Sequence, residues 1–405
     1  MDGLFDNPRM SSVLFTGFGP SPCAPRRAIA ETIELSDDVR DVRKLVRARC
    51  PCRPGVYGML DAAGELIYVG MSARLRDRLL TYFTKGRPGA KEQRIAAHAA
   101  RLVWELGDHE LTVQLRELEL IRHWRPRFNA RGRPGRHEIG YIYLAAGEAP
   151  SLRAGRRVPQ AAQHCWGPLP LNRRVRAAVQ QLNYLFQLRD CPDRTPMRYA
   201  EQMTLLAHDG HPACLRGEIG TCLAPCSGQR TQQDYAQRIA AARALLDGRD
   251  TTMIDRYELA MQDAADRRAF EQAATYRNLW EQLTLLHDQL QLLRSAQRDY
   301  WFVYPVQGYS ATHTRATIEW LLIAGGTLVA VLREPRTPAA ARRCLGLLEQ
   351  TFADRQFPAS EDYDQIRLVA AWFRQHPDER GRILDPDQAQ AICRERTEES
   401  PCVAP

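Results

Sequence analysis

Two tyrosines and three arginines lie close together in a stretch whose residue types and spacing could do chemistry. Tyr57 and Tyr68 each occupy an apolar run of β-forming residues, and residues 61–64 between them have the composition of a hairpin turn. The apolar period then changes to that of a helix. That helix carries Arg74, Arg76 and Arg78. The pattern predicts a β-hairpin followed at once by a basic helix. Taken one at a time, ordinary strand tyrosines and a solvated helix face would explain these residues equally well.

Four sequence pieces follow one another in order within about 75 residues: PGVYGM, LIYVGMS, RLRDRL and RELELIRHWRPRFN. Together they resemble the GIY-YIG nuclease domain of the UvrC/Cho type, the incision proteins of bacterial nucleotide excision repair. Four pieces in the right order are a far more specific signal than any one of them, because a single YVG is common.

The resemblance implies hydrolysis of a phosphodiester, which needs an activated water, charge neutralisation at phosphorus and stabilisation of the leaving 3′ oxygen. It makes Glu117 the ligand of one divalent ion, Mg²⁺ or Mn²⁺, and Arg78 the contact to the scissile phosphate. Tyr57 and Tyr68 are the motif tyrosines, with Tyr57 favoured as the general base. Asn129 matches the residue that closes the site. Further contacts to DNA are expected from Arg74, Arg76, Arg125 and Arg127.

One residue departs from the family pattern. UvrC-type sequences commonly have a lysine directly after YVG, and this chain has Met71 there. A tyrosine with an ordinary pKa of about 10 needs a nearby cation to act as a base near neutral pH. Arg74 or Arg76 could supply that charge, although a guanidinium is not equivalent to an ammonium.

A second group of candidate residues consists of four cysteines: Cys191, Cys214, Cys222 and Cys226. The last three have the spacing C-x7-C-x3-C, which differs from the paired CxxC knuckles of structural zinc sites. A [4Fe-4S] cluster, a zinc ion and buried free thiols all fit the spacing. The segment CLRGEIGTCLAPC resembles the cysteine segment of UvrC, and this resemblance favours the [4Fe-4S] cluster. Cys191 lies further upstream than is usual for that segment.

Apolar stripes at 257–265 and 270–280, separated by a polar bend at Asp266–Arg268, predict an antiparallel helix pair. The stretch AADRRAFEQAATYRNLWEQL resembles the UVR motif, through which UvrC docks on UvrB. The resemblance therefore implies a UvrB-type helicase subunit as partner, and any other helical hairpin is the alternative. The expected contact residues are Phe270, Ala273, Ala274 and Arg277.

Composition sets limits on the class of protein. The chain has 405 residues, of which 44% are hydrophobic and 26% charged, and a formal net charge of +8. This charge permits a polyanionic partner such as damaged double-stranded DNA. The longest apolar run, residues 320–332, is too short to cross a bilayer, and no secretion signal is visible. Eleven cysteines in such a chain argue against a disulfide framework, so we expect a cytoplasmic protein without membrane association.

The expected fold class is α+β: a small mixed-sheet nuclease domain, a cysteine-rich helical segment, a helical hairpin and a small α/β C-terminal cap. The expected boundaries are a disordered N-terminus at 1–36, the nuclease domain at 37–148, a linker at 149–170, the cysteine-rich segment at 171–232, the hairpin region at 233–295 and the cap at 296–405.

The function implied by the resemblance is a metal-dependent endonuclease of nucleotide excision repair. Residues 300–405 are too few for the second, RNase H-like nuclease and the helix-hairpin-helix domains of full-length UvrC. A single incision on the 3′ side of a lesion marked by UvrB is therefore expected. The alternatives are an adapter that binds UvrB and DNA without cutting, and an iron-sulfur redox regulator.

Overall fold

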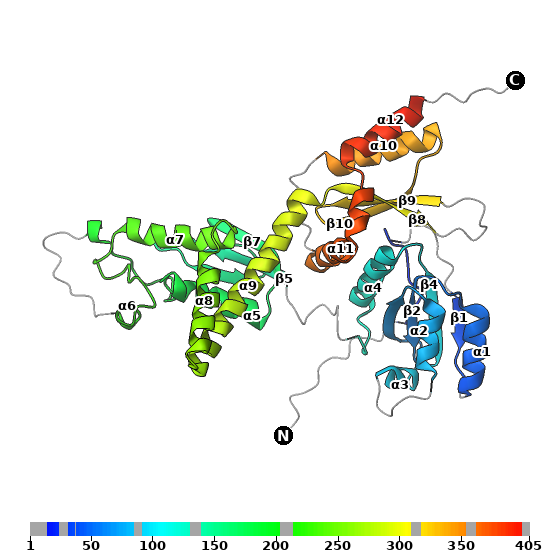
Figure 1. Cartoon of the computed structure of the whole chain (residues 1–405), viewed down its shortest axis with the longest axis horizontal. Coiled ribbons are helices and arrows are strands. Elements are labelled where there is room, and N and C mark those ends of the chain that lie inside the picture. Colours follow the sequence, from blue (N-terminus) through cyan, green and yellow to red (C-terminus); the bar gives the residue numbers. More distant parts are fainter. Residues whose placement is uncertain are drawn as a thin grey trace. The chain divides into compact units, whose positions relative to one another are not determined.

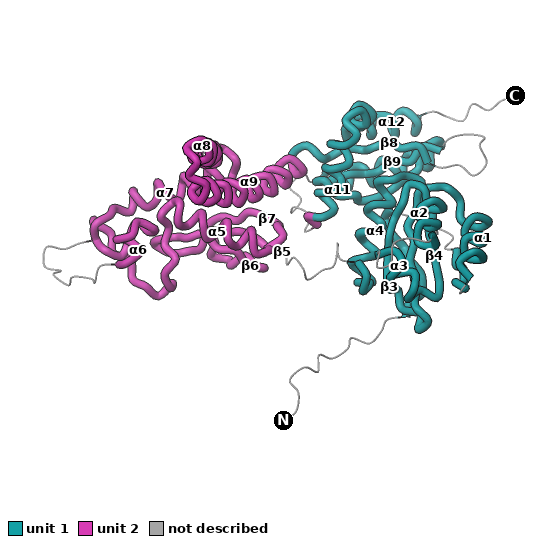
Figure 2. Tube along the Cα trace, turned by 60° about the horizontal axis from the view of Figure 1, so that its bottom comes forward, with its two compact units in different colours: residues 1–134, 298–357, 364–405 teal, residues 135–297, 358–363 magenta. Residues whose placement is uncertain are grey.

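A computed structural model of the chain describes residues 14–23, 31–36, 38–84, 91–129, 139–202, 214–308, 317–353 and 362–398. The chain divides into two compact units (Figure 2). Unit 1 contains residues 1–134, 298–357 and 364–405, and unit 2 contains residues 135–297 and 358–363. No helix within the described ranges is long and apolar enough to span a bilayer.

Unit 1 begins with a four-stranded antiparallel sheet in the order β1-β4-β2-β3. The expected hairpin is confirmed as β2 and β3, and the Asp61 carboxylate closes its turn by accepting from the backbone N–H groups of Ala63 and Glu65. The strands are β1 (Glu31–Glu34), β2 (Gly55–Leu60), β3 (Leu66–Ser72) and β4 (Arg101–Leu106). The helices around this sheet are α1 (Val39–Arg49), α2 (Leu75–Tyr82), α3 (Lys91–Ala96) and α4 (Glu110–Trp124).

The sheet is apolar on both faces, as the nearly continuous burial of β2 and β3 shows. Tyr57 and Tyr68 belong to the face that packs against α1, α2 and α3. The opposite face packs against α4 through residues such as Val69 and Leu120. Each alternating set of strand residues is therefore buried by a different layer of helices. This arrangement leaves β3 as an edge strand between the two layers.

The expectation of a disordered N-terminus at 1–36 is wrong for the described parts of that range. β1 pairs with β4 along the sheet edge. Residues 14–23 lie on α4, where the buried Arg116 guanidinium donates to the carbonyl oxygens of Phe18 (2.8 Å) and Gly19 (2.6 Å) while pairing with Glu105 (3.2 Å). Phe18 is buried in the apolar cluster under α4. A Gly-, Pro- and Ser-rich segment is thus ordered by one aromatic anchor and by the spare donors of a buried arginine.

The C-terminal cap of unit 1 is a three-stranded antiparallel sheet in the order β10-β9-β8, with helices on both faces (Figure 1). α10 and α12 pack on one face through an apolar cluster that includes Trp320 and Leu348. α11 packs on the other, where the Phe373 ring meets Phe302 and Tyr304. The cap elements are β8 (Phe302–Gly308), β9 (Thr317–Ala324), β10 (Thr327–Arg333), α10 (Pro338–Phe352), α11 (Tyr363–Gln375), the 3-10 helix η2 (Pro377–Arg382) and α12 (Pro386–Glu398).

The cap contacts α4 at both ends of that helix. At the N-terminus, His109 caps α4 by accepting from the Leu111 N–H (3.2 Å), and its ring meets the edges of Trp372 and Tyr304 at centroid distances of 5.0 and 5.6 Å. Near the C-terminus, Arg122 forms a 2.9 Å ion pair with Asp364 of the cap. Burial lowers the pKa of His109 to about 4, assisted by His376 and opposed by Glu379.

Unit 2 has a three-stranded antiparallel sheet in the order β6-β5-β7, followed by helices. The expectation of a linker at 149–170 is wrong, because two of these strands fall there, and β5 lies in this sheet although it was expected within the nuclease domain. The elements are β5 (Ile139–Leu144), β6 (Leu152–Gly155), β7 (His164–Pro170), α5 (Arg173–Leu185), the 3-10 helix η1 (Ala200–Gln202), α6 (Leu215–Glu218), α7 (Gln232–Leu246), α8 (Thr252–Asp266) and α9 (Phe270–Asp299).

The predicted antiparallel helix pair is present as α8 and the first part of α9. Arg268, with φ of 59°, lies in the bend between them. Tyr257 and Tyr276 face each other across the pair with ring centroids 6.2 Å apart, as two antiparallel helices require. Ala264 is fully buried at the crossing, whereas Phe270 at the bend is 70% exposed.

The contact at His109 predicts a pH-dependent stability for unit 1. A histidine whose pKa falls to about 4 on folding binds fewer protons in the folded state. The contribution of the neutral His109 contact to the free energy of unfolding is therefore complete above the ordinary pKa of about 6.5, and it is lost as pH falls toward 4. His109→Asn keeps a helix-capping side chain but does not titrate. Between pH 7 and pH 4, the free energy of unfolding of the parent should fall by about 3 kcal/mol more than that of this variant.

Urea unfolding at pH 4, 5, 6 and 7 measures this difference. The matched control is His123→Asn at the exposed end of the same helix, which should follow the parent. A His109→Asn protein with the pH dependence of the parent would show that the His109 contact does not titrate with folding.

Candidate active site

The free edge of β3 is closed by the chain that follows α4. Asn129, which is buried, binds Val69 with its whole amide: its Nδ2 donates to the Val69 carbonyl (2.7 Å) and its Oδ1 accepts from the Val69 N–H (2.9 Å). One step along, the Phe128 N–H donates to the carbonyl of Ile67 (3.0 Å). Asn129 thus serves as a substitute for a neighbouring strand, and it fixes the edge on which the candidate site is built.

Glu117 of α4 satisfies the next outward-facing group of the same edge by accepting from the Met71 N–H. The side chain is half-buried, and burial raises the pKa of its carboxyl to about 7, although Met71 and Lys91 both act to lower it. In the described part of the chain, no three His, Cys, Asp or Glu side chains gather in one place as metal ligands. Glu117 is therefore a single carboxylate that faces the edge of β3.

Three tyrosines and one arginine form a connected cluster on the other side of β3. The hydroxyls of Tyr57 and Tyr82 are 2.9 Å apart and hydrogen-bonded, and the Arg78 guanidinium donates to both, at 3.3 and 3.4 Å. The Tyr68 ring lies 6.1 Å from that of Tyr57 and 6.2 Å from that of Tyr82. Arg78 also pairs with Glu92 of α3 at 3.3 Å. The cluster joins β2, β3, α2 and α3.

Burial raises the pKa of both Tyr57 and Tyr82, and the neighbouring Arg78 only partly offsets this effect at Tyr57. Both phenols are therefore protonated near neutral pH. Arg78 alone does not turn Tyr57 into a base, and a base role would need further positive charge at the cluster.

Tyr57 reaches the edge strand because its cross-strand partner is a glycine. Tyr57 pairs with Gly70, and a Cβ on Gly70 would lie 2.5 Å from the Tyr57 hydroxyl and 2.6 Å from its Cζ. No real side chain fits such a distance, so the glycine of the motif is required by this ring position.

The four remaining arginines expected at DNA lie apart from the tyrosine cluster. Arg74 pairs with Asp77 at 2.6 Å, and the Arg76 guanidinium donates to the Cys50 carbonyl at 2.7 Å. Arg125 ends α4 in a left-handed conformation, and Arg127 lies 3.5 Å from Asp61. Of the basic residues on α2, only Arg78 contacts the tyrosines.

Two residues of the cluster escaped the sequence analysis. Tyr82 is buried one helical turn after Arg78, and the spacing of Leu75, Leu79 and Tyr82 at i, i+4 and i+7 could have revealed it. Lys91 at the start of α3 places its ammonium 5.2 Å from the centroid of the Tyr68 ring. No motif marks it, because it reaches the site from a separate helix.

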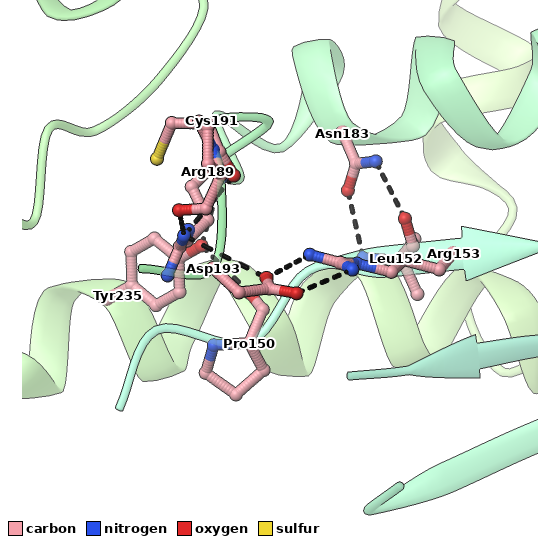
Figure 3. Close-up of polar contacts among 9 residues, drawn as sticks. Pro150, Leu152, Arg153, Asn183, Arg189, Cys191, Asp193 and Tyr235 are labelled. Atoms are coloured by element: carbon pink, nitrogen blue, oxygen red, sulfur yellow. Dashed lines mark hydrogen bonds and ion pairs between the residues drawn. The ribbon is translucent and has the colours of Figure 1, made fainter. Parts of the chain in front are cut away.

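The cysteine-bearing loop after α5 is anchored to the sheet of unit 2 (Figure 3). The Arg189 N–H donates to the Tyr235 hydroxyl (3.0 Å), which in turn donates to the Pro150 carbonyl (2.8 Å). Asp193 forms a bidentate pair with Arg153 of β6. These bonds hold Cys191 between two fixed points of the loop.

The thiols of Cys191, Cys214, Cys222 and Cys226 interact with one another. Burial raises the pKa of Cys222 to about 11, and the other three thiolates raise it further. Cys226 also has a raised pKa and a hydrogen bond with Cys214. The four predicted ligands therefore lie in one neighbourhood, although no three of them are close enough to enclose a single ion.

The close approach of Tyr57 to Gly70 predicts a strong coupling between these two residues. Gly70→Ala must displace the Tyr57 ring and should cost about 1–3 kcal/mol of unfolding free energy, the usual cost of overpacking. In a Tyr57→Ala background the same change should cost much less, because the three atoms nearest to the added Cβ all belong to Tyr57. Urea unfolding of the four proteins gives the coupling energy.

Gly346→Ala in α10 is the matched control, because a Cβ there meets nothing within 4 Å. It should leave the stability unchanged or slightly raised. Equal costs of Gly70→Ala with and without Tyr57 would contradict the described ring position.

Comparisons with known proteins find similarity to UvrC in two parts of the chain. The profile of the UvrC-like GIY-YIG domain matches residues 53–130, and that of the UvrC/Cho excinuclease middle domain matches residues 139–245. UvrABC system protein C of Nitrosococcus oceani is 31% identical over 71% of this chain, and that of Moorella thermoacetica is 33% identical over 57%. The chain spans 45% and 36% of the lengths of these relatives.

Among solved structures, the GIY-YIG N-terminal endonuclease domain of UvrC from Thermotoga maritima, bound to magnesium, is 28% identical. The match covers 24% of this chain and all of that domain, with a TM-score of 0.21. From the two profile matches and the UvrABC system relatives, residues 53–130 belong to the UvrC-like GIY-YIG domain family and residues 139–245 to the UvrC/Cho middle-domain family.

Proposed function

We propose that this protein is a metal-dependent endonuclease of nucleotide excision repair that cuts one DNA strand on the 3′ side of a lesion. The observation that carries the proposal is the hydrogen-bonded cluster of Tyr57, Tyr82 and Arg78, with Glu117 at the edge of the neighbouring strand β3, within a segment that matches the UvrC-like GIY-YIG domain. One such cluster is present in the described part of the chain, and the proposal is accordingly a single incision.

The residues at the edge of β3 fit a magnesium or manganese ion held by Glu117. Mg²⁺ keeps several waters and commonly binds one or two carboxylates together with substrate phosphate, so a lone glutamate is an adequate protein ligand. When bound, the ion would neutralise charge on the phosphate and lower the pKa of a coordinated water. Glu117 is already oriented for this task by the Met71 N–H.

The protein residues around Glu117 then have separate tasks. Arg78 binds the scissile phosphate with the face of its guanidinium that the tyrosines leave open, since its side chain is 36% exposed. Tyr57 and Tyr82 hold each other's hydroxyl in place, and Tyr57 is the group that receives or relays the proton of the attacking water. Tyr68 forms one wall of the cluster. Asn129 keeps Val69 in position through both ends of its amide.

DNA is the proposed substrate and a UvrB-type helicase subunit the proposed partner. The net charge of +8 favours a polyanion, and Arg125 and Arg127 are exposed on the turn after α4. The helical hairpin supports the second partner. Phe270 (70% exposed) and Leu259 (65% exposed) are large apolar side chains at solvent, and a UVR-type docking surface would cover them.

The four cysteines are proposed to hold a [4Fe-4S] cluster. A zinc ion and a [4Fe-4S] cluster can each take four cysteine ligands. The resemblance of CLRGEIGTCLAPC to the cysteine segment of UvrC favours the cluster. Burial and mutual repulsion raise the pKa values of Cys222 and Cys226, and binding a cationic centre would relieve the repulsion.

The proposed function predicts one nick in an end-labelled damaged duplex incubated with the protein, UvrA, UvrB and Mg²⁺ or Mn²⁺. Labelling the damaged strand separately at its 5′ and 3′ ends should place that nick on the 3′ side of the lesion. Glu117→Ala should lose nicking while its affinity for DNA stays nearly unchanged, because phosphate contacts dominate affinity. Glu110→Ala, which removes a carboxylate from the start of the same helix, is the matched control and should cut normally.

Two outcomes would count against the proposal. If Glu117→Ala nicks DNA as well as the parent, the assignment of Glu117 as the metal ligand is wrong. Absence of any nick with the parent protein, in the presence of a UvrB preparation that loads on the lesion, would favour the non-cleaving adapter.

The cluster proposal predicts that anaerobically purified protein is brown, with about four iron and four sulfide per chain. Cys222→Ser together with Cys226→Ser should lose the iron. Cys165→Ser, which changes an exposed thiol outside this group, should keep it. A colourless protein with one zinc per chain, or iron retained after the double substitution, would overturn the cluster assignment.

A further inference from the structure

Lys91 brings an ammonium group to the tyrosine cluster from α3. Its Nζ lies 5.2 Å from the centroid of the Tyr68 ring, a distance at which a cation interacts with an aromatic face. It also lies near enough to Glu117 to lower the pKa of that carboxyl. The charged and titratable groups around it are Tyr57, Tyr68, Arg78, Tyr82, Glu92 and Glu117, which come from β2, β3, α2, α3 and α4.

The choice of lysine at this position is unusual for this chain. Only three of its 56 basic residues are lysines, at positions 44, 85 and 91, and the rest are arginines. Lys44 is exposed on α1, and Lys85 lies outside the described residues. An ammonium is a compact point charge with three freely rotating donors, whereas a guanidinium is a rigid planar fork. A site that already contains Arg78 thereby gains a cation of a different kind.

The strand itself cannot supply this ammonium. The position directly after Gly70 holds Met71, whose side chain packs with the apolar cluster under α4. The Met71 N–H is bound to Glu117. Lys91 instead brings positive charge to the Tyr68 ring, on the face of the sheet that carries the tyrosine cluster.

We propose that Lys91 is a catalytic residue that contacts the scissile phosphate opposite Arg78, in place of a cation on β3. The inference rests on the proposed nuclease function. In hydrolysis the water oxygen bonds to phosphorus and the bond to the 3′ oxygen breaks. One water proton leaves to a base, and the 3′ oxygen takes one up. The non-bridging oxygens carry extra negative charge between these events, and an ammonium placed there stabilises that state more than the ground state.

Lys91→Met in the full chain tests the proposal. With DNA saturating, the nicking rate should fall about 100-fold, the typical loss when one donor to a developing charge is removed. The logarithmic slope of DNA affinity against salt should fall by about one, since one phosphate contact is gone. Lys44→Met is the matched control, because it removes an equal charge from α1 and should change neither quantity.

Lys91→Arg, which keeps a positive charge at the same position, should restore at least tenfold in rate over Lys91→Met. A purely structural role of Lys91 would leave the salt slope unchanged and would not be rescued in this way. Lys91 is exposed, so its substitution should leave the circular dichroism spectrum and the melting temperature of the protein unchanged.

The outcomes separate this inference from the proposed function. If the parent nicks DNA and Lys91→Met nicks equally well, the nuclease stands and the role of Lys91 is wrong. If the parent does not nick but Lys91→Met still lowers the salt slope by about one, the phosphate contact stands and the nuclease proposal falls. An unchanged slope without nicking refutes both.

Discussion

The unpaired edge of β3 is the constraint on which the candidate site depends. A strand at the edge of a sheet exposes backbone groups that must find partners, and in β3 these belong to alternate residues: Ile67, Val69 and Met71. Phe128, Asn129 and Glu117 satisfy them in that order. Because the groups repeat every two residues, closing the edge also sets how far along it Glu117 lies. The metal-ligand candidate is thus positioned by the same bonds that complete the sheet.

In unit 2 an asparagine also pairs with the free backbone groups of an edge strand. Its β6 is an edge strand, and Asn183 of α5 binds Leu152 with both ends of its amide, at 3.0 and 2.9 Å (Figure 3). A side-chain amide has one donor and one acceptor with nearly the spacing of a peptide group, so it can replace a strand residue without extending the sheet. Each asparagine amide is held by the backbone of an edge strand. A polar residue in a motif can therefore be required for the backbone that it holds rather than for chemistry.

Local patterns in the sequence were enough to predict the β2–β3 hairpin, the basic helix after it and the α8–α9 pair. In each case alternation or helical period, with a turn signal, acts between residues that are close in the sequence. The order of residues 14–23 could not be predicted in this way. It depends on Arg116, which lies 98 residues further along the chain and donates to the Phe18 carbonyl. This bond can form only once α4 has folded and buried the Arg116 guanidinium. Likewise β6, with four residues, is too short to show an alternating pattern, and β7 pairs with β5 across the intervening β6 segment, so both read as a Pro- and Gly-rich linker.

Contacts between residues that are distant in the sequence also explain why only part of the candidate site could be predicted. Tyr57, Tyr68 and Arg78 lie within one hairpin and one helix, and the sequence brings them together directly. The balance of charge around them comes from separate elements: Glu92 and Lys91 from α3, and Glu117 from α4. Met71 on its own favours an adapter that has lost a catalytic cation. In space the deficit at position 71 is offset by Lys91, because the edge strand, α3 and α4 meet there. Loss of a charged residue from a motif is therefore weak support for loss of activity until the charges that the fold brings to the same place have been counted.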